Sequence, residues 1–418
     1  MTFHFLHVLR CAAIALLTVL MTVPNATAAA AQSTERPPES EAEKHGDNVK
    51  IRGHLQNSFH RFSTEKKGHV AFLGGSITEM EGYRPRLMEW LQKRFPETQF
   101  TFTNAGIAST CSHTGAFRLQ RDVLSQGPVD LLLVEFAVND DQDARHSADD
   151  CVRGMEGIIR HARTFNSKSD IVMIDFVNPE MLELAQAGKT AVSVEQHEKV
   201  ARQYEISSVD LPSVLADRIA AGSMTWDTFG GTHPGPLGNQ LAADLVAEVL
   251  QAGWRAAAVS PQPPAEHPEL PSPLLDSCFD RGKFLPAESV TLGTGWTLGI
   301  PDWKNIAGSQ RDRFLHDPIF YSTQPGSTLT FSFDGQAVGA FVVAGPDAGR
   351  LEVQVDEEEW KTVDLYHSYS SGLHYPRTVM FASGLPKGSH HVTVRIATSH
   401  HELSKGTAAR ILQFAVSE

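Results

Sequence analysis

The sequence lacks several features that would each point to a particular class of protein. Its 418 residues include only four cysteines, and no block of Lys and Arg offsets a formal net charge of −13. We find no H-E-x-x-H motif and no Cys/His cluster, so the sequence predicts no metal site and no cofactor. An acidic chain without a basic block is a poor candidate for binding nucleic acid or an anionic membrane. Charged residues make up 20% and hydrophobic residues 41% of the chain, a composition typical of soluble globular domains.

Long hydrophobic runs are also scarce, and the main one stands at the start. Arg10 precedes an apolar run over residues 11–23, and Ala26-Thr27-Ala28 follows it. This pattern predicts a secretory signal peptide over residues 1–28, cleaved after Ala28. No later run is long enough to span a bilayer. We therefore expect an exported protein, periplasmic or extracellular, without a membrane anchor. Residues 1–28 carry one Arg and no acid, so the mature net charge is −13 − 1 = −14.

Three cysteines remain after cleavage: Cys111, Cys151 and Cys278. An oxidising compartment permits one disulfide among them. We prefer Cys111–Cys151, because both are expected on loops or helix starts of one domain. Three free thiols are the alternative.

Residues 29–48 are rich in Ala, Ser, Glu and Pro and predict a flexible lead-in. Residues 49–254 then alternate between strand-like and helix-like patterns, which predicts a parallel sheet with helices on both faces. The expected strands cover residues 70–73, 100–103, 129–136, 171–176 and 207–211. The expected helices cover residues 83–95, 115–124, 149–164, 214–221 and 237–251.

A Pro-rich stretch, residues 255–275, predicts a semi-rigid linker and a domain boundary. Beyond it, residues 276–418, apolar residues alternate with polar ones, and no helical period is present. Examples are Leu329, Phe331 and Phe333, and later Val392, Val394 and Ile396. Short alternating strands predict an all-β, jelly-roll-like sandwich. The pairs His390-His391 and His400-His401 lie in this region; neighbours in a strand point to opposite faces, so we expect solvated histidines there.

Chemistry-bearing residues follow the ends of the predicted strands. The first predicted strand is followed by Gly75-Ser76, the second by Asn104-Ala105-Gly106 and the third by Asn139-Asp140. The fifth predicted strand is followed, after a helix, by His233-Pro234. In an open parallel sheet these positions meet at one edge, where ligands bind. Each motif alone is as common in turns, caps and loops, but the four together in this order favour an active site.

A serine beside a histidine predicts acyl transfer. Imidazole is the usual base that takes the proton of a serine nucleophile near neutral pH. The tetrahedral intermediate needs preorganised donors, and the backbone amides of Ser76 and Gly106 with the side-chain amide of Asn139 would supply them. Position 78 is threonine, so the Gly-x-Ser-x-Gly elbow of α/β-hydrolases is absent.

These four blocks resemble those of the SGNH (GDSL-like) hydrolases over roughly residues 66–254. The resemblance implies a flavodoxin-like three-layer α/β/α fold and ester hydrolysis, with Ser76 as nucleophile, His233 as general base, and Ser76, Gly106 and Asn139 as the oxyanion hole. The sequence departs from the family pattern at Gly75, where Asp is usual, and at Gly230, where the triad acid is usual. Either Asp227 or a backbone carbonyl is then expected to orient His233.

The layout also resembles secreted SGNH carbohydrate esterases, which implies an acetyl ester on a carbohydrate or polysaccharide as substrate. Two alternatives stay open: an O-acyltransferase that uses the same site, and a non-catalytic glycan-binding protein. The sandwich is rich in aromatic residues that either contact sugar or fill its core. They are Trp296, Trp303, Tyr321, Trp360, Tyr366, Tyr369 and Tyr375. The sequence leaves the oligomeric state open.

Overall fold

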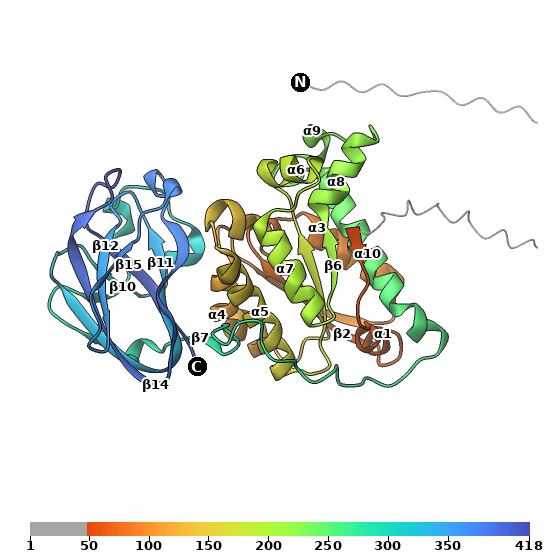
Figure 1. The fold of residues 1–418 in the computed structure, drawn as a ribbon, viewed down its shortest axis with the longest axis horizontal. Coiled ribbons are helices and arrows are strands. Elements are labelled where there is room, and N and C mark those ends of the chain that lie inside the picture. Colours follow the sequence, from red (N-terminus) through yellow and green to blue (C-terminus); the bar gives the residue numbers. More distant parts are fainter. Residues whose placement is uncertain (1–47) are drawn as a thin grey trace, which may run out of the picture. The chain divides into compact units, whose positions relative to one another are not determined.

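The computed structural model describes residues 48–418, which contain an α/β domain and an all-β domain (Figure 1). The predicted signal peptide, and all but the last residue of the predicted lead-in, lie outside the described residues. The α/β domain contains six strands: β1 (Val49–Lys50), β2 (Lys67–Gly74), β3 (Gln99–Gly106), β4 (Leu131–Glu135), β5 (Asp170–Asp175) and β6 (Ser207–Asp210).

These strands form one sheet in the order β1-β6-β5-β4-β2-β3. The five strands from β2 to β6 pair in parallel, and the short β1 adds an antiparallel edge along β6. Counted along the chain, the parallel strands run in the order 2-1-3-4-5, the flavodoxin-like arrangement. The predicted parallel sheet is therefore confirmed.

Helices cover both faces of this sheet. They are α1 (Gln56–Ser63), α2 (Ser76–Glu79), α3 (Tyr83–Arg94), α4 (Ser112–Asp122), α5 (Ala148–Phe165), α6 (Pro179–Gln186), α7 (Val192–Gln203), α8 (Leu211–Ala220), α9 (Trp226–Phe229) and α10 (Pro236–Val259). A π-helical turn, η3 (Asn139–Asp143), follows β4.

Alternation along the central strands creates two cores. In β2, Val70 and Phe72 pack with α1, α3 and α10, whereas Ala71 and Leu73 pack with α4 and α5. Strands β4 and β5 divide their side chains in the same way, because successive residues of a strand face opposite sides of the sheet. Buried apolar runs therefore produce three layers, as expected for parallel strands.

Helix α10 continues to Val259, and residues 260–281 then run along the α/β domain. This segment is held by specific hydrogen bonds. The backbone of Ala265 exchanges two with the Asn57 side chain, at 2.8 and 2.9 Å. His267 donates from Nε2 to Asp170 Oδ1 (2.9 Å), and the amides of Leu274 and Leu275 donate to the buried Glu156 carboxylate. We call residues 260–281 the strap.

The second domain is a single antiparallel sheet folded over its own core. Its strands are β7 (Gly282–Phe284), β8 (Val290–Leu292), β9 (Thr297–Gly299), β10 (Ile319–Ser322), β11 (Thr328–Ala344), β12 (Gly349–Val355), β13 (Lys361–Asp364), β14 (Tyr375–His400) and β15 (Ala409–Ser417). The central order is β13-β12-β14-β11-β15-β10-β9. Register shifts after Gly335 and Val338 interrupt the long β11–β14 pair. The predicted alternation of apolar residues supplies the core of this sandwich, so its fold is also confirmed.

The preferred disulfide prediction is wrong: Cys111, Cys151 and Cys278 are all free and buried. The two thiols of the predicted pair have different neighbours. Cys111 Sγ lies 4.0 Å from Thr114 Oγ1, and Cys151 Sγ lies 4.0 Å from the carbonyl of His146. Of the helices in residues 48–418, none combines the length and the apolar character that crossing a bilayer requires.

Candidate active site

The turn that carries Ser76 lies at the carboxyl end of β2, and two glycines make it. A Cβ at Gly74 would lie 2.1 Å from Glu135 Oε1, and one at Gly75 would lie 2.1 Å from Asn139 Oδ1. Both distances are far below van der Waals contact, so any larger residue would displace the groups beneath the turn. The Gly75 that departs from the family pattern is thus required here by the close approach of Asn139.

Glu135, at the end of β4, holds the start of α2. Its Oε1 accepts hydrogen bonds from the amides of Gly75 (2.8 Å) and Thr78 (3.2 Å) and from Thr78 Oγ1 (2.7 Å). The side chain is fully buried, and this burial raises the pKa of Glu135 to about 7. Its Oε2 has no hydrogen-bond partner among the described residues. Glu135 therefore positions the nucleophile turn.

His233 lies opposite this turn, with its Nε2 2.8 Å from Ser76 Oγ. The loop that presents it follows α9 through Gly230 and Gly231, whose φ values are +102° and +89°. A Cβ at Gly230 would also lie 2.0 Å from the amide nitrogen of Gly235. An aspartate, the usual triad acid at this position, would be strained and would clash. The Ser–His contact expected from the sequence is present.

Asp227 does not meet His233, contrary to its predicted role. It lies in α9 with an exposed side chain, and it makes no hydrogen bond to the histidine. The capping box of Thr225 and Thr228 fixes this short helix without help from Asp227. Across residues 48–418, no carboxylate or carbonyl accepts a hydrogen bond from His233 Nδ1, so the backbone-carbonyl alternative is not observed either.

Asn139 begins η3 and lies against the nucleophile turn, as the motif predicts. Its Nδ2 donates to Asp143 Oδ2 at 2.7 Å, one helical turn along. The same carboxylate accepts a hydrogen bond from Gln142, and burial raises the pKa of Asp143. An amide nitrogen has two hydrogens. The second hydrogen of Asn139 Nδ2 has no acceptor among residues 48–418, and Asn139 lines the same cavity as Ser76.

Gly106 is not placed as the predicted oxyanion donor. Its amide donates to Asn104 Oδ1 at 3.0 Å, and the residue lines a separate hollow with Arg121 and Arg313. Glycine is required there for packing, because a Cβ would lie 2.3 Å from the amide nitrogen of Glu79 in α2. The sequence pattern thus located a residue that supports the site from outside it.

A different residue, Ser109, offers an unbonded backbone amide at the cavity beside Ser76. It lines the same cavity as Ser76 and His233 and adopts φ +70°, a left-handed conformation uncommon for a serine. Its amide makes no hydrogen bond within residues 48–418. The sandwich domain holds this strained residue: Arg311 donates from Nη2 to Ser109 Oγ (2.7 Å) and from Nη1 to the carbonyl of Ala108.

Residues of both domains line the cavity beside Ser76. It has a volume of about 560 Å³. The α/β domain contributes Ser76, Ser109, Asn139, Asp143 and His233; the sandwich contributes Arg311 and residues around Tyr369, Leu373 and Tyr375. His367 of the sandwich also donates to the carbonyl of Asp143 at 2.9 Å. Tyr369 lines this cavity and is 51% exposed.

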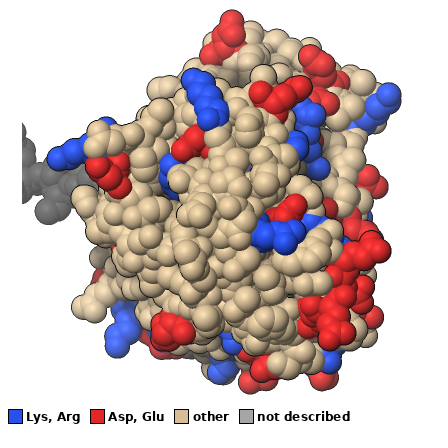
Figure 2. Space-filling model, turned by 90° about the vertical axis from the view of Figure 1, so that its left-hand side faces the viewer, with Lys and Arg blue, Asp and Glu red and all other residues tan. Residues whose placement is uncertain are grey.

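The remaining aromatic residues of the sandwich divide between core and surface. Trp296, Tyr366 and Tyr375 are buried, whereas Trp360 is 39% exposed. His390 is also buried, bonded to Asp356 and to the carbonyl of Pro386, while its neighbour His391 is exposed. The expectation that both histidines are solvated is therefore wrong for His390. On the face drawn in Figure 2, Lys and Arg are scattered and acidic side chains gather along one edge.

Sequence reasoning missed Glu135, Ser109 and Arg311, and it named Tyr369 only among the aromatic residues that either contact sugar or fill the sandwich core. A charged residue that ends the apolar run 131–134 is a signal that could have identified Glu135. No local pattern marks Arg311 or Tyr369, because their proximity to Ser76 depends on contacts with another domain.

Comparison with known proteins gave one family match. Residues 72–241 match the GDSL-like Lipase/Acylhydrolase family. A search of curated proteins gave no match.

Solved structures match the fold of both domains. A two-domain esterase (CEX) active on acetylated mannans is 22% identical, with a TM-score of 0.71, over 90% of this chain and 98% of that chain. The same esterase co-crystallized with mannopentaose matches with a TM-score of 0.70, with the same identity and coverage. An acetyl xylan esterase, AlAXEase, is 21% identical with a TM-score of 0.38, over 44% of this chain and 99% of that chain.

Proposed function

We propose that the protein is an esterase that removes acetyl groups from an acetylated carbohydrate, a proposal supported by the match of residues 72–241 to the GDSL-like Lipase/Acylhydrolase family. The observation that carries the proposal is the 2.8 Å contact between Ser76 Oγ and His233 Nε2 at a cavity lined by both domains. The two-domain fold shared with an esterase active on acetylated mannans supports the choice of substrate. The predicted export, which suits a polysaccharide substrate, remains part of the proposal.

The proposed reaction proceeds in two steps. His233 Nε2 takes the proton of Ser76 Oγ as that oxygen attacks the ester carbonyl carbon. The carbonyl oxygen becomes an oxyanion within reach of the Ser76 amide, the Ser109 amide and Asn139 Nδ2. When the intermediate collapses, the sugar oxygen leaves with the proton from His233. Water, deprotonated by the same histidine, then releases acetate and restores Ser76.

The site operates as a Ser–His pair, because no side chain orients His233 through Nδ1 within the described residues. An acid in that position fixes the tautomer of the imidazole and stabilises its charged form. Here the loop around Pro234 and Gly235 restrains the ring, and Asn239 donates to the Gly235 carbonyl at 3.0 Å.

Hydrolysis of 4-nitrophenyl acetate by the full chain tests the nucleophile. We expect Ser76→Ala to lower kcat by about 10³-fold or more, the scale of losing a nucleophile. A fluorophosphonate reagent should label the wild type once, on the peptide that contains Ser76. Ser389→Ala, which changes an exposed serine of β14, is the matched control. Equal activity of wild type and Ser76→Ala would refute the assignment.

The alternatives give different products. An acyltransferase would transfer acetyl to an added sugar faster than to water, whereas the proposal predicts that free acetate accumulates faster. A glycan-binding protein without activity would retain acetylated glycan, release no acetate and resist the fluorophosphonate.

A further inference from the structure

The fold brings together three metal-binding side chains that are separated in the sequence. Cys111 precedes α4, Asp140 lies in η3, and His146 lies in the loop before α5. One ligand atom from each lies within 4.8 Å of the other two. Sequence patterns did not predict this group, because the spacing of the three residues matches no metal-binding motif. Its donor set of thiolate, imidazole and carboxylate is one that Zn²⁺ accepts.

His146 and Asp140 are separated by a distance that two ligands of one metal ion would have. His146 Nδ1 lies 3.3 Å from Asp140 Oδ1, within ion-pair distance, and no well-aligned hydrogen bond joins these two atoms. The His146 side chain is only 10% exposed and Asp140 is fully buried. Two ligands of a tetrahedral zinc ion, each about 2.0–2.1 Å from the metal, lie about 3.3 Å apart. The observed distance between His146 Nδ1 and Asp140 Oδ1 matches this ligand–ligand distance.

Hydrogen bonds from the Ser112 amide and the His197 side chain hold the Asp140 carboxylate in place. Its Oδ1 accepts the amide of Ser112 at 2.8 Å, and its Oδ2 accepts from His197 Nε2 at 3.0 Å. His197 is bonded in turn to Asp175 Oδ1 at 3.1 Å, and these three side chains are almost completely buried. Hydrogen-bonded partners of this kind orient metal ligands and strengthen binding.

A cavity gives access to the group. It has a volume of about 260 Å³ and is lined by Cys111, His113 and His146 together with residues of the sandwich, among them His367 and Arg377. We propose that Cys111, Asp140 and His146 bind one Zn²⁺ ion, with water from this cavity in the fourth position. Three protein ligands and an open position are a common arrangement for zinc.

The ion would join the two loops that carry Ser109 and Asn139. The role of these two residues as oxyanion donors, and with it the role of the ion, rests on the proposed function. Cys111 follows Ser109 by two residues, and Asp140 directly follows Asn139. One ion bonded to both loops would fix Ser109 and Asn139 relative to each other. Its role is therefore to position these donors, and the metal does not touch the ester.

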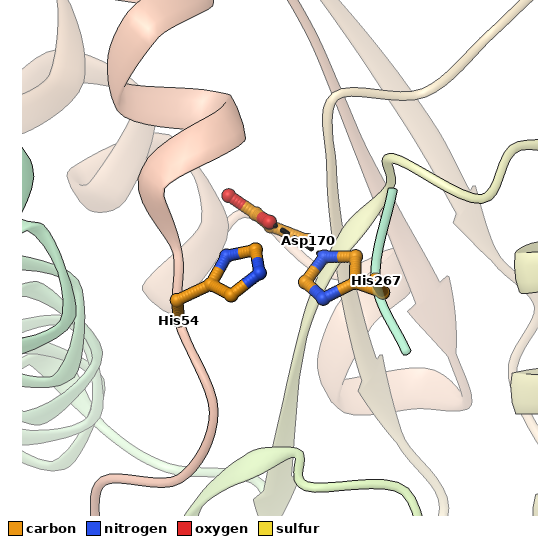
Figure 3. A group of neighbouring side chains, drawn as sticks. All are labelled: His54, Asp170 and His267. Atoms are coloured by element: carbon orange, nitrogen blue, oxygen red, sulfur yellow. Dashed lines mark hydrogen bonds and ion pairs between the residues drawn. The ribbon is translucent and has the colours of Figure 1, made fainter. Parts of the chain in front are cut away.

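A second group of similar composition provides an internal contrast. His54, Asp170 and His267 also lie together, and Figure 3 shows the two imidazole rings next to each other with a dashed bond from His267 to Asp170. The ring centroids are 4.4 Å apart and the planes differ by 8°. The lone pairs of an imidazole lie in its plane, so stacked rings cannot direct theirs to one ion. His267 Nε2 is also engaged with Asp170 at 2.9 Å. We expect no metal there.

The proposal is tested by measuring metal binding to the full chain, which carries no affinity tag and has been freed of metal with a chelator. Equilibrium dialysis should find one Zn²⁺ per chain, and Co²⁺ in its place should give the near-ultraviolet charge-transfer band of a thiolate ligand. Cys111→Ser should abolish the band, and His146→Ala should weaken Zn²⁺ binding by tenfold or more. Cys278→Ser and His267→Ala, which change residues outside the proposed group, are the controls and should leave both readouts unchanged. Circular dichroism establishes that each variant is folded.

Two results would overturn the proposal: a folded wild type that binds no Zn²⁺, or one whose binding survives both Cys111→Ser and His146→Ala. Ser76→Ala separates this proposal from the proposed function, because it should bind metal like the wild type while losing activity. Metal binding without esterase activity in the wild type would refute the proposed function alone.

Discussion

Single side chains from outside the predicted motifs shape this active site. Ser109 holds a left-handed conformation because Arg311, from the other domain, bonds its hydroxyl and the preceding carbonyl. Glu135 fixes the nucleophile turn from beneath. The structure brings Ser76, Asn139 and His233 together at one cavity, as the sequence motifs predict. It engages the Gly106 amide with Asn104 and places Asp227 on a short helix without contact to His233, and neither arrangement can be predicted from the spacing of the motifs.

Replacing Arg311 with alanine should lower kcat by about 10- to 100-fold with a smaller change in KM. The variant keeps the Ser109 amide but frees its loop, so the loss should be smaller than the 10²–10³-fold cost of deleting an oxyanion donor. Arg395→Ala, which removes a guanidinium paired with Glu352 on the same domain, should change kcat little. Equal effects of the two variants on 4-nitrophenyl acetate hydrolysis would contradict the role of Arg311.

Replacing Asp227 with alanine should change kcat by less than about threefold. A triad aspartate contributes about 10⁴-fold, whereas this side chain is exposed and does not contact His233. The same ester assay measures it. A loss of 10²-fold or more would mean that Asp227 reaches the histidine during turnover.

Replacing Glu135 with glutamine should change how stability depends on pH. Because the folded pKa, about 7, lies above the ordinary value of 4.5, this group's contribution is present below pH 4.5 and is lost as pH rises through 7. The loss amounts to at most about 3 kcal/mol. Urea unfolding between pH 4.5 and 8 should therefore show the Glu135→Gln variant gaining stability relative to wild type as pH rises. The exposed Glu357→Gln serves as control, and parallel curves for wild type and Glu135→Gln would contradict this account.

At the scale of elements, the hydrophobic pattern predicted the strands and helices whose buried faces are apolar, and it missed those whose buried faces carry polar residues. The five parallel strands and the helices α3, α5 and α10 follow their apolar runs closely. Helix α7 escaped prediction because its inward face buries Ser193, His197 and Glu198, which give no apolar period. The Pro-rich segment was expected to be a linker; its composition could not reveal the hydrogen bonds that hold the strap to the α/β domain.

Replacing His267 with alanine should destabilise the protein by about 1–2 kcal/mol, because the change removes the bond to the buried Asp170 carboxylate. Urea unfolding of the full chain measures the difference. His316→Ala, which changes an exposed histidine of the sandwich, should leave the free energy of unfolding unchanged. If the two variants unfold alike, the strap contributes nothing through this contact.

At the scale of the molecule, the two domains together complete the site. Arg311, Tyr369 and Tyr375 of the sandwich line the cavity that contains Ser76, and both domains lie in one compact unit. The hydroxyls of Thr114 and Thr378 also meet across the domains at 2.8 Å. The sequence predicted the sandwich from its two-residue period but left its role open, because contacts between separately patterned regions leave no local signal.

The open ring of Tyr369 should act on carbohydrate and hardly on a small ester. We expect Tyr369→Ala to raise KM for an acetylated oligosaccharide about fivefold, the scale of about 1 kcal/mol of aromatic contact, and to change KM for 4-nitrophenyl acetate by less than twofold. Trp360→Ala removes an exposed ring that lies outside the cavity and should change neither. A uniform effect of Tyr369→Ala on both substrates would contradict a sugar-contacting role.

Acetate release from acetylated mannan oligosaccharides, by the full chain and by its Ser76→Ala variant, is the most direct measurement of the central claim. The account predicts that the wild type releases acetate with a higher kcat/KM than it shows for 4-nitrophenyl acetate, and that Ser76→Ala loses about 10³-fold or more. Acetate release that persists in Ser76→Ala would contradict the claim, as would a wild type that cleaves the small ester and leaves every acetylated carbohydrate intact.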